Sequence, residues 1–172
     1  MRTYIKIVVL IALLVSIVAC GKRSETVYVE KDGKKYEIAD QVSFYYPKSF
    51  QMNTTLENKE IIQFVRNQEV ISYRTIIDDT DNDVSDLPEL YAGQLEEDGA
   101  KDVGYKNVEV TSGLVCQEFT GSYQSTGIQF IHMAYFTSHS TYVLSYEAPK
   151  DDYEKNIGVI TQYLNSRVVH SE

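Results

Sequence analysis

The side chains that could bind a metal ion are densest in an acidic stretch near the middle of the chain. Asp79, Asp81 and Asp83 occupy the first, third and fifth positions of a calcium-binding loop, which requires hard oxygen ligands at this spacing. The pattern then fails, because Val84 stands where the loop needs glycine and Leu90 where it needs a bidentate glutamate. We therefore predict a solvated acidic loop without a metal, and calcium binding there is the alternative.

The other reactive side chains show no catalytic spacing. The three histidines, His132, His139 and His170, stand at no metal-ligand spacing from one another or from Cys116. The sequence carries no nucleophile elbow, no P-loop and no dinucleotide-binding glycine pattern. Cys116 lies in an apolar strand pattern and is predicted to be a buried hydrophobe rather than a nucleophile. We therefore predict no enzyme, no catalytic residue and no cofactor.

Cys20 is the cysteine whose surroundings indicate chemistry. It follows a basic start, with Arg2 and Lys6, and an unbroken apolar run over residues 7–15. This layout is that of a secretory signal, and the run is shorter than the roughly 20 apolar residues that cross a bilayer. A cysteine thiolate is a good nucleophile for alkylation. An uncleaved N-terminal anchor and an ordinary signal with a chance cysteine are the alternatives.

The sequence IVAC at residues 17–20 resembles a bacterial lipobox. In that pattern diacylglycerol is joined to the cysteine sulfur, and the chain is cut before the cysteine. The resemblance implies that residues 1–19 are a signal peptide and that Cys20 is the lipidation site. It also implies that fatty acyl chains such as palmitate hold the protein at the extracytoplasmic face of a bacterial cell membrane. Two such chains anchor a protein durably, whereas one does so only marginally.

The charge balance excludes one class of partner. The chain has a formal net charge of −9, and removing residues 1–19 takes away Arg2 and Lys6 and no acid, which gives −11. Nucleic-acid binding needs a basic surface, so no nucleic acid is expected as a partner. Adhesion to anionic lipid by charge is disfavoured for the same reason, and the membrane contact is assigned to the diacylglycerol on Cys20.

The length of the chain fits one hydrophobic core. No linker or internal repeat divides the sequence. We predict a tether over residues 20–25 and a single domain over residues 26–172.

The elements expected in this domain begin with a hairpin. Asp32-Gly33 is a strong two-residue turn signal, and it would pair Val29 with Tyr36. Strands are also expected over residues 42–47, 60–66 and 70–78, followed by three or four antiparallel strands over residues 106–148.

Two capping boxes predict helices, one opening at Asp86 and the other at Asp151. An apolar stripe would hold the first helix against the sheet, and Gly99 would end it. The members of that stripe are Leu87, Leu90, Tyr91 and Leu95. Runs of strands with segregated helices predict an α+β fold.

The order of these elements resembles the PsbP-like superfamily. The segments that carry the resemblance are YYPKSF at residues 45–50, YVLSYEAP at 142–149 and a last helix that ends in LNSRVV at 164–169. The resemblance covers residues 42 to about 169 and implies an antiparallel β-sheet with helices packed on it. Known members mostly dock on other proteins and share no catalytic motif, so no site residue is carried over.

Together these observations predict a lipid-anchored, extracytoplasmic lipoprotein that acts as a non-enzymatic protein-interaction or complex-stabilising module, with an envelope protein as partner. A small-ligand or calcium-binding surface lipoprotein is the alternative. A hydrolase would need a deep pocket that holds His132 beside Cys116 or a carboxylate.

The 14 tyrosines fit half-buried strand positions, or else a surface that grips a partner. The residues that distinguish these readings are Tyr45, Tyr46, Tyr123 and Tyr135.

Overall fold

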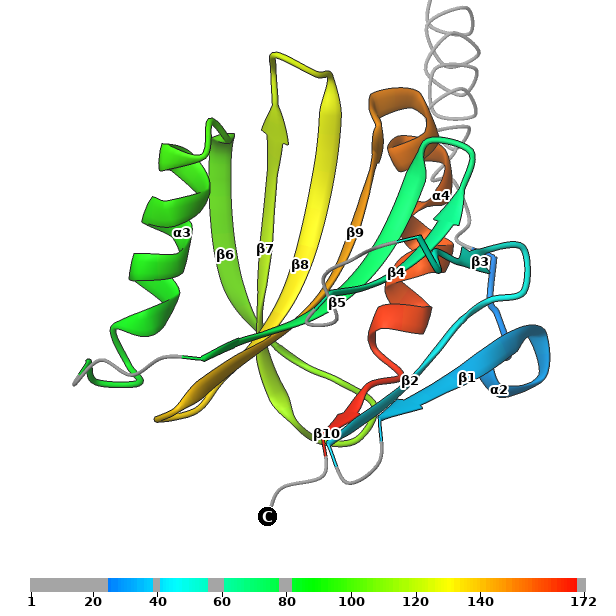
Figure 1. Ribbon diagram of the computed structural model, residues 1–172, viewed down its shortest axis with the longest axis horizontal. Coiled ribbons are helices and arrows are strands. Elements are labelled where there is room, and N and C mark those ends of the chain that lie inside the picture. The colour runs from blue at the N-terminus through cyan, green and yellow to red at the C-terminus, as the bar shows by residue number, and fades with distance from the viewer. Residues whose placement is uncertain (1–24, 39–40, 56–60, 78–81, 170–172) are drawn as a thin grey trace, which may run out of the picture.

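The structure is a computed structural model that describes residues 25–38, 41–55, 61–77 and 82–169 (Figure 1). The predicted signal peptide, Cys20, Asp79 and Asp81 lie outside the described residues. No helix within the described ranges is both long enough and apolar enough to cross a membrane.

A seven-stranded antiparallel sheet forms the centre of the domain, in the order β3-β4-β5-β9-β8-β7-β6. Its strands are β3 (Gln51–Met52), β4 (Ile61–Arg66), β5 (Glu69–Ile77), β6 (Lys101–Glu109), β7 (Val115–Tyr123), β8 (Ile128–Phe136) and β9 (Ser140–Pro149). The four strands from β6 to β9 form a meander, as the turn signals predicted. β6 begins earlier than expected, at Lys101.

A second sheet of three antiparallel strands stands beside the first, in the order β1-β2-β10. It consists of β1 (Gly33–Ile38), β2 (Val42–Pro47) and β10 (Val168–Val169). The sequence did not predict β10, because two valines at the end of a chain carry too little pattern to indicate a strand.

Helices α3 (Leu87–Glu97) and α4 (Lys150–Leu164) pack on opposite faces of the large sheet. Successive strand residues point to opposite faces. On β8, Phe130 and Ala134 accordingly join the core beneath α3, whereas Ile131 and Met133 join the core beneath α4. Figure 1 shows α3 beside β6 and α4 on the side of the small sheet. The central strands are therefore covered on both faces.

The predicted hairpin at Asp32-Gly33 is wrong. Residues Val29–Asp32 form a short helical turn, α2, and β1 starts at Gly33 and pairs with β2. Gly33 has an extended backbone with φ −101°, so no turn conformation requires glycine there. A Cβ at this position would lie 2.5 Å from the carbonyl oxygen of Val29. The glycine is needed for this close approach, a feature that the dipeptide signal cannot reveal.

The helix positions were predicted better than their caps. Both helices begin close to the expected residues, but neither has a side-chain hydrogen bond at its N-cap. Gly99 follows α3 with φ +96°, a left-handed conformation that favours glycine, as predicted for a C-terminal stop. Leu90 was expected in the buried stripe of α3, but its side chain is 52% exposed.

A buried arginine closes the core beneath α4. Arg167 is fully buried and donates hydrogen bonds to the carbonyl oxygens of Met133 (2.9 Å) and Tyr142 (3.1 Å) and to Cys116 Sγ (2.6 Å). Cys116 is buried in the hydrophobic core, as predicted. These bonds fasten the segment after α4 to strands β7, β8 and β9.

A second buried charge links three elements. Glu69, at the start of β5, is 3% exposed and accepts hydrogen bonds from Arg66 Nε (2.8 Å) and Nη2 (2.7 Å). It also accepts bonds from the Tyr146 hydroxyl on β9 (2.7 Å) and from Asn156 on α4 (2.9 Å). Burial opposes the charge of Glu69, but the bonds from Arg66 and Tyr146 outweigh it, so the pKa of Glu69 lies below its usual value. This carboxylate joins the β4–β5 hairpin to β9 and α4.

We expect Glu69→Ala to lower the free energy of unfolding by about 2–4 kcal/mol, because Tyr146 and Asn156 would lose a buried acceptor and Arg66 its counter-charge. Urea unfolding measures the change. The control is Glu154→Ala, which removes an exposed ion pair with Lys150 and should cost less than about 1 kcal/mol. Equal effects of the two substitutions would contradict the role assigned to Glu69.

Candidate functional site

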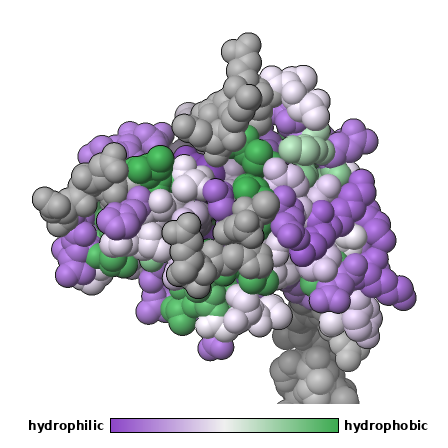
Figure 2. All heavy atoms as spheres, turned by 60° about the horizontal axis from the view of Figure 1, so that its bottom comes forward, coloured by the Kyte–Doolittle hydropathy of each residue, from purple (hydrophilic) through white to green (hydrophobic). Residues whose placement is uncertain are grey.

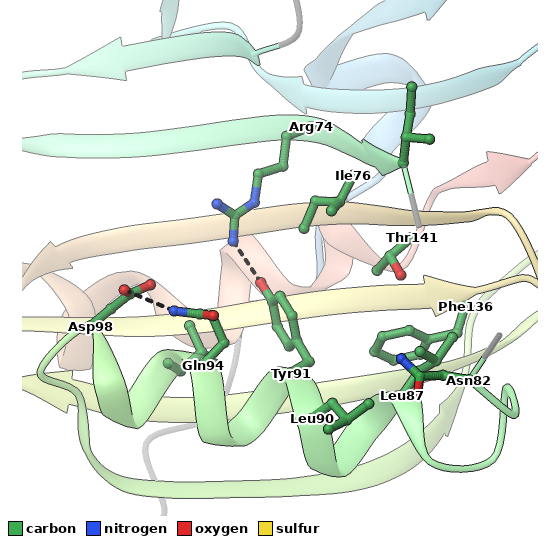
Figure 3. Close-up of a pocket in the computed structure, with 12 residues that line it drawn as sticks. Arg74, Ile76, Asn82, Leu87, Leu90, Tyr91, Gln94, Asp98, Phe136 and Thr141 are labelled. Carbon is green, nitrogen blue, oxygen red and sulfur yellow. Dashed lines mark hydrogen bonds between the residues drawn. The ribbon is translucent and has the colours of Figure 1, made fainter. Parts of the chain in front are cut away.

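A pocket of about 340 Å³ lies between α3 and the end of β5 (Figure 3). Residues of three strands, of α3 and of its flanking loops form it. Its lining consists of Arg74, Ile76, Ile77, Asn82, Leu87, Leu90, Tyr91, Gln94, Leu95, Asp98, Phe136 and Thr141. A volume of this size lies at the lower end of the range for small-molecule sites, which is roughly 300–1,000 Å³.

The periodicities of α3 and β5 place these side chains. On α3, Leu87, Tyr91 and Leu95 recur every fourth residue and are buried against the sheet. On β5, Ile71 and Tyr73 enter the core beneath α4, whereas Arg74 is on the opposite face and lines the pocket. The helix stripe and the strand alternation thus bring one cation and several apolar side chains together.

A chain of polar contacts runs from the pocket into the sheet. Arg74 Nη2 donates to the Tyr91 hydroxyl (2.9 Å), and this hydroxyl lies 2.9 Å from His132 Nδ1. His132 Nε2 lies 3.4 Å from Glu147 Oε1, which is within ion-pair distance but outside hydrogen-bond geometry. Arg74 and Tyr91 line the pocket, and His132 stands behind them.

The hydrogen-bond donors in this series of contacts determine where the protons of Tyr91 and His132 lie. An arginine can only donate, so the Tyr91 oxygen accepts from Arg74 and its own proton goes to His132 Nδ1. The imidazole proton is then on Nε2, facing Glu147. Burial lowers the pKa of His132 and favours its neutral form. The contact with His132 is the main cause that holds the pKa of Glu147 below its usual value.

Exposed apolar side chains surround the opening of the pocket. Ile77 is 71% exposed, Leu90 52%, Val84 39% and Ile76 36%. Three of these four line the pocket, and Val84 stands in the loop just before α3. Figure 2 shows hydrophobic side chains on the α3 side of the molecule, among hydrophilic ones. We call Ile76, Ile77, Val84 and Leu90 the apolar rim.

The residues weighed for hydrolysis lie outside the lining of this pocket. His132 has a carboxylate neighbour, Glu147, but its side chain is only 3% exposed and does not line the pocket. Cys116 belongs to the core beneath α4, on the other face of the sheet. His139 is exposed in the β8–β9 turn. The structure therefore brings His132 to a carboxylate without giving it access to solvent.

The acidic loop is only partly described. Asp83 is exposed, and its carboxylate accepts the backbone N–H of Ser85 (2.9 Å). The described residues contain no group of three or more acidic, histidine or cysteine side chains that could hold a metal ion. Calcium binding by Asp79, Asp81 and Asp83 stays an untested alternative.

The tyrosines singled out in the sequence are half-buried, as strand positions would require. They are Tyr45, Tyr46, Tyr123 and Tyr135. Among the tyrosines that the structure describes, the most exposed are instead Tyr28 (72%) and Tyr105 (49%).

Arg74, Tyr91 and Glu147 are the site residues that the sequence did not reveal. The alternation of β5 could have placed Arg74 and Ile76 on one face, and the stripe of α3 already contained Tyr91. Their contact depends on β5 pairing with β9, from which it is separated by more than 60 residues of chain. Local pattern carries no signal for a pairing over that distance.

The comparisons with known proteins bear on the fold. The solution structure of cyanobacterial PsbP (CyanoP) from Synechocystis sp. PCC 6803 is similar to 87% of this chain and 99% of that one, with a TM-score of 0.55 and 10% identity. A crystal structure from Bacteroides thetaiotaomicron VPI-5482 has a TM-score of 0.47 and 14% identity, over 82% of this chain and 50% of that one. A protein of unknown function from Pseudomonas aeruginosa has a TM-score of 0.40 and 13% identity, over 78% and 94%.

No family model and no curated protein matches the sequence. The similarity to cyanobacterial PsbP supports the predicted PsbP-like fold, and the structure has antiparallel sheets and few helices. At 10% identity it shows the fold alone, because one fold supports many functions.

The burial of His132 predicts a pH dependence of stability. In the unfolded chain a histidine takes up a proton near pH 6.5, whereas folded His132 does so at lower pH. Between these two values the unfolded state binds more protons, so stability falls as the pH falls. We expect the free energy of unfolding to drop by about 1 kcal/mol from about pH 7.5 to about pH 5.5.

Urea unfolding at the two pH values measures this drop, and His132→Gln should remove most of it. The matched control is His139→Gln, which alters the exposed histidine and should keep the drop. A drop of the same size in His132→Gln would show that another group causes it.

Proposed function

We propose that this protein is a lipid-anchored, extracytoplasmic bacterial lipoprotein whose PsbP-like domain, spanning residues 26–172, is a non-enzymatic protein-interaction or complex-stabilising module. The partner is an envelope protein that contacts the apolar rim beside α3. Neither catalysis nor a cofactor is part of this proposal.

The apolar rim is the observation that carries the proposal. Scattered exposed apolar residues are ordinary on a soluble protein, but a gathered patch is typical of an interaction site. Three of the large exposed apolar side chains, on β5 and α3, line one pocket, and a fourth stands in the loop before α3. Leu90 is exposed, unlike the buried residues of its own helix, and it therefore adds to this apolar patch.

The helix beneath the apolar rim is firmly packed, which favours docking of a partner. The side chains of α3 that face the sheet, Leu87, Tyr91 and Leu95, are buried in a core with Phe119 and Phe136. A fixed backbone loses less conformational entropy when a partner binds. Leu90 is therefore presented by a helix that need not rearrange.

The anchor is inferred from the sequence at residues 17–20, which supports diacylglycerol on Cys20. The net charge of −11 that remains without residues 1–19 disfavours adhesion of the domain itself to anionic lipid. The anchor then keeps the domain in the two-dimensional layer where envelope proteins are concentrated, which raises its effective concentration for a weak contact.

A second candidate function is small-ligand binding in the pocket. Its volume of about 340 Å³ and its mixture of apolar walls with a few polar groups are typical of ligand sites. In this reading the apolar rim is the entrance of a receptor.

The anchor is tested by metabolic labelling with a fatty-acid probe. Cys20→Ala should remove the label, because the acyl chains are attached through this cysteine. The matched control is Cys116→Ala, which changes the other cysteine and should keep the label. Labelling that persists in Cys20→Ala would overturn the anchor.

The interaction is tested by crosslinking in the native cell, followed by mass spectrometry. We expect one dominant envelope protein to be joined to the wild type and to be lost in Cys20→Ala. If crosslinking joins no protein above background, the interaction module fails and the small-ligand function takes its place.

A further inference from the structure

We propose that the pocket between α3 and β5 binds the single carboxylate of an apolar acid, with the Arg74 guanidinium contacting the carboxylate and the apolar walls enclosing the rest. The inference deepens the second candidate function, because it names the chemical class of ligand. Such a carboxylate belongs either to a small free acid or to the C-terminus of a peptide with an apolar last residue.

Arg74 is the side chain that selects a carboxylate. Its guanidinium has five N–H donors in a planar fork, which matches the two oxygens of a carboxylate. One of these donors is used by the Tyr91 hydroxyl. Among the described residues no ion pair includes Arg74, although the chain is rich in acids. The pocket therefore offers a half-buried cation to an anion from outside.

The contact with Tyr91 prepares Arg74 for this role. The tyrosine is buried, and its hydroxyl is held between Arg74 and His132. A guanidinium fixed in this way has less rotamer freedom to lose when it binds a ligand. Because burial keeps His132 neutral, Arg74 carries the positive charge of the polar chain alone.

The charged side chains of the pocket lie toward one end. Figure 3 shows Arg74 and Asp98 there with Gln94, whereas Leu87 and Phe136 lie toward the other end together with the uncharged polar residues Asn82 and Thr141. A ligand with its charge at one end and an apolar body at the other fits this division. Such a ligand buries its body against the apolar walls, which contributes about 25 cal/mol per Å² of apolar area.

The charges around the pocket favour one negative charge over several. Asp98 lines the pocket, and Glu147 lies close enough to Arg74 for its pKa to be lowered by the guanidinium, after the stronger effect of His132. The repulsion by these two carboxylates and the attraction by the one guanidinium are both about twice as large for a dianion such as phosphate as for a monoanion. Because the carboxylates outnumber the cation, the second negative charge adds more repulsion than attraction. The site is therefore matched to a carboxylate and not to a phosphate.

The test is an NMR titration of the full chain held in lipid nanodiscs, with empty nanodiscs as the blank. The probes are hexanoate, hexanamide and inorganic phosphate. We expect hexanoate to bind about tenfold or more tightly than hexanamide, because only the acid can form charge-assisted bonds with Arg74. Phosphate should show no saturable binding. Equal affinities for hexanoate and hexanamide, or tighter binding of phosphate, would overturn the inference.

The source of the carboxylate is settled by two further probes, a short peptide that ends in leucine as the free acid and as the amide. Tighter binding of the peptide acid than of hexanoate assigns the pocket to a polypeptide C-terminus. Tighter binding of hexanoate assigns it to a free acid. Failure of every acid to bind overturns the inference.

Variants connect the binding to the residues. Arg74→Gln should weaken hexanoate binding by about 10- to 100-fold and leave hexanamide unchanged. The matched control is Lys155→Gln, which removes a positive charge from the exposed side of α4 on the other face of the sheet. It should change neither affinity. Unchanged hexanoate binding in Arg74→Gln would exclude Arg74 as the carboxylate contact.

A second variant tests the apolar wall of the pocket. Leu90→Ser alters a side chain that is already 52% exposed, so the fold should persist even if Arg74→Gln fails to fold. It should weaken hexanoate and hexanamide alike, by about three- to tenfold. No weakening would show that the acid binds elsewhere.

The outcome is separable from that of the proposed interaction function. Crosslinking to an envelope protein that persists while all acids fail to bind would reject only the ligand. Acid binding without a crosslinked protein would reject only the partner.

Discussion

The central strands of the large sheet are buried on both faces, and the rest of the structure follows from this constraint. Strands β8 and β9 have few exposed positions, because α3 covers one face and α4 the other. Any polar side chain on these strands then needs a partner, since an unpaired buried polar group is costly. The polar groups beneath the two helices are satisfied differently, and this difference separates an enclosed half of the domain from the half that contains the pocket.

Beneath α4 the buried charges are enclosed. Glu69 is satisfied by Arg66, Tyr146 and Asn156, and Arg167 donates to two carbonyl oxygens and a sulfur. Beneath α3 the corresponding chain of contacts, from Glu147 to Arg74, ends at a pocket. The same physical requirement thus produces a sealed core on one face and a polar group presented to solvent on the other.

The sequence predicted what depends on local periodicity. Strand alternation, the positions of α3 and α4 and the stop at Gly99 are short-range patterns, and all of them appear. The prediction of a turn at Asp32-Gly33 was wrong, because glycine is needed there for close approach to the Val29 carbonyl oxygen and to the ring of Tyr163, a residue 130 positions away. The pocket escaped prediction for the same reason, since Arg74 and His132 meet only through strand pairing and the placement of α3.

We propose that the apolar rim beside α3 is the surface on which this protein acts, and site-directed photo-crosslinking in the native cell tests this most directly. A photoreactive amino acid would replace Leu90 on the rim or Met52 on β3, which is 44% exposed and similarly apolar. The account predicts a specific adduct from position 90 and none from position 52. An adduct from position 52 alone would contradict it and place the working surface at the opposite edge of the sheet.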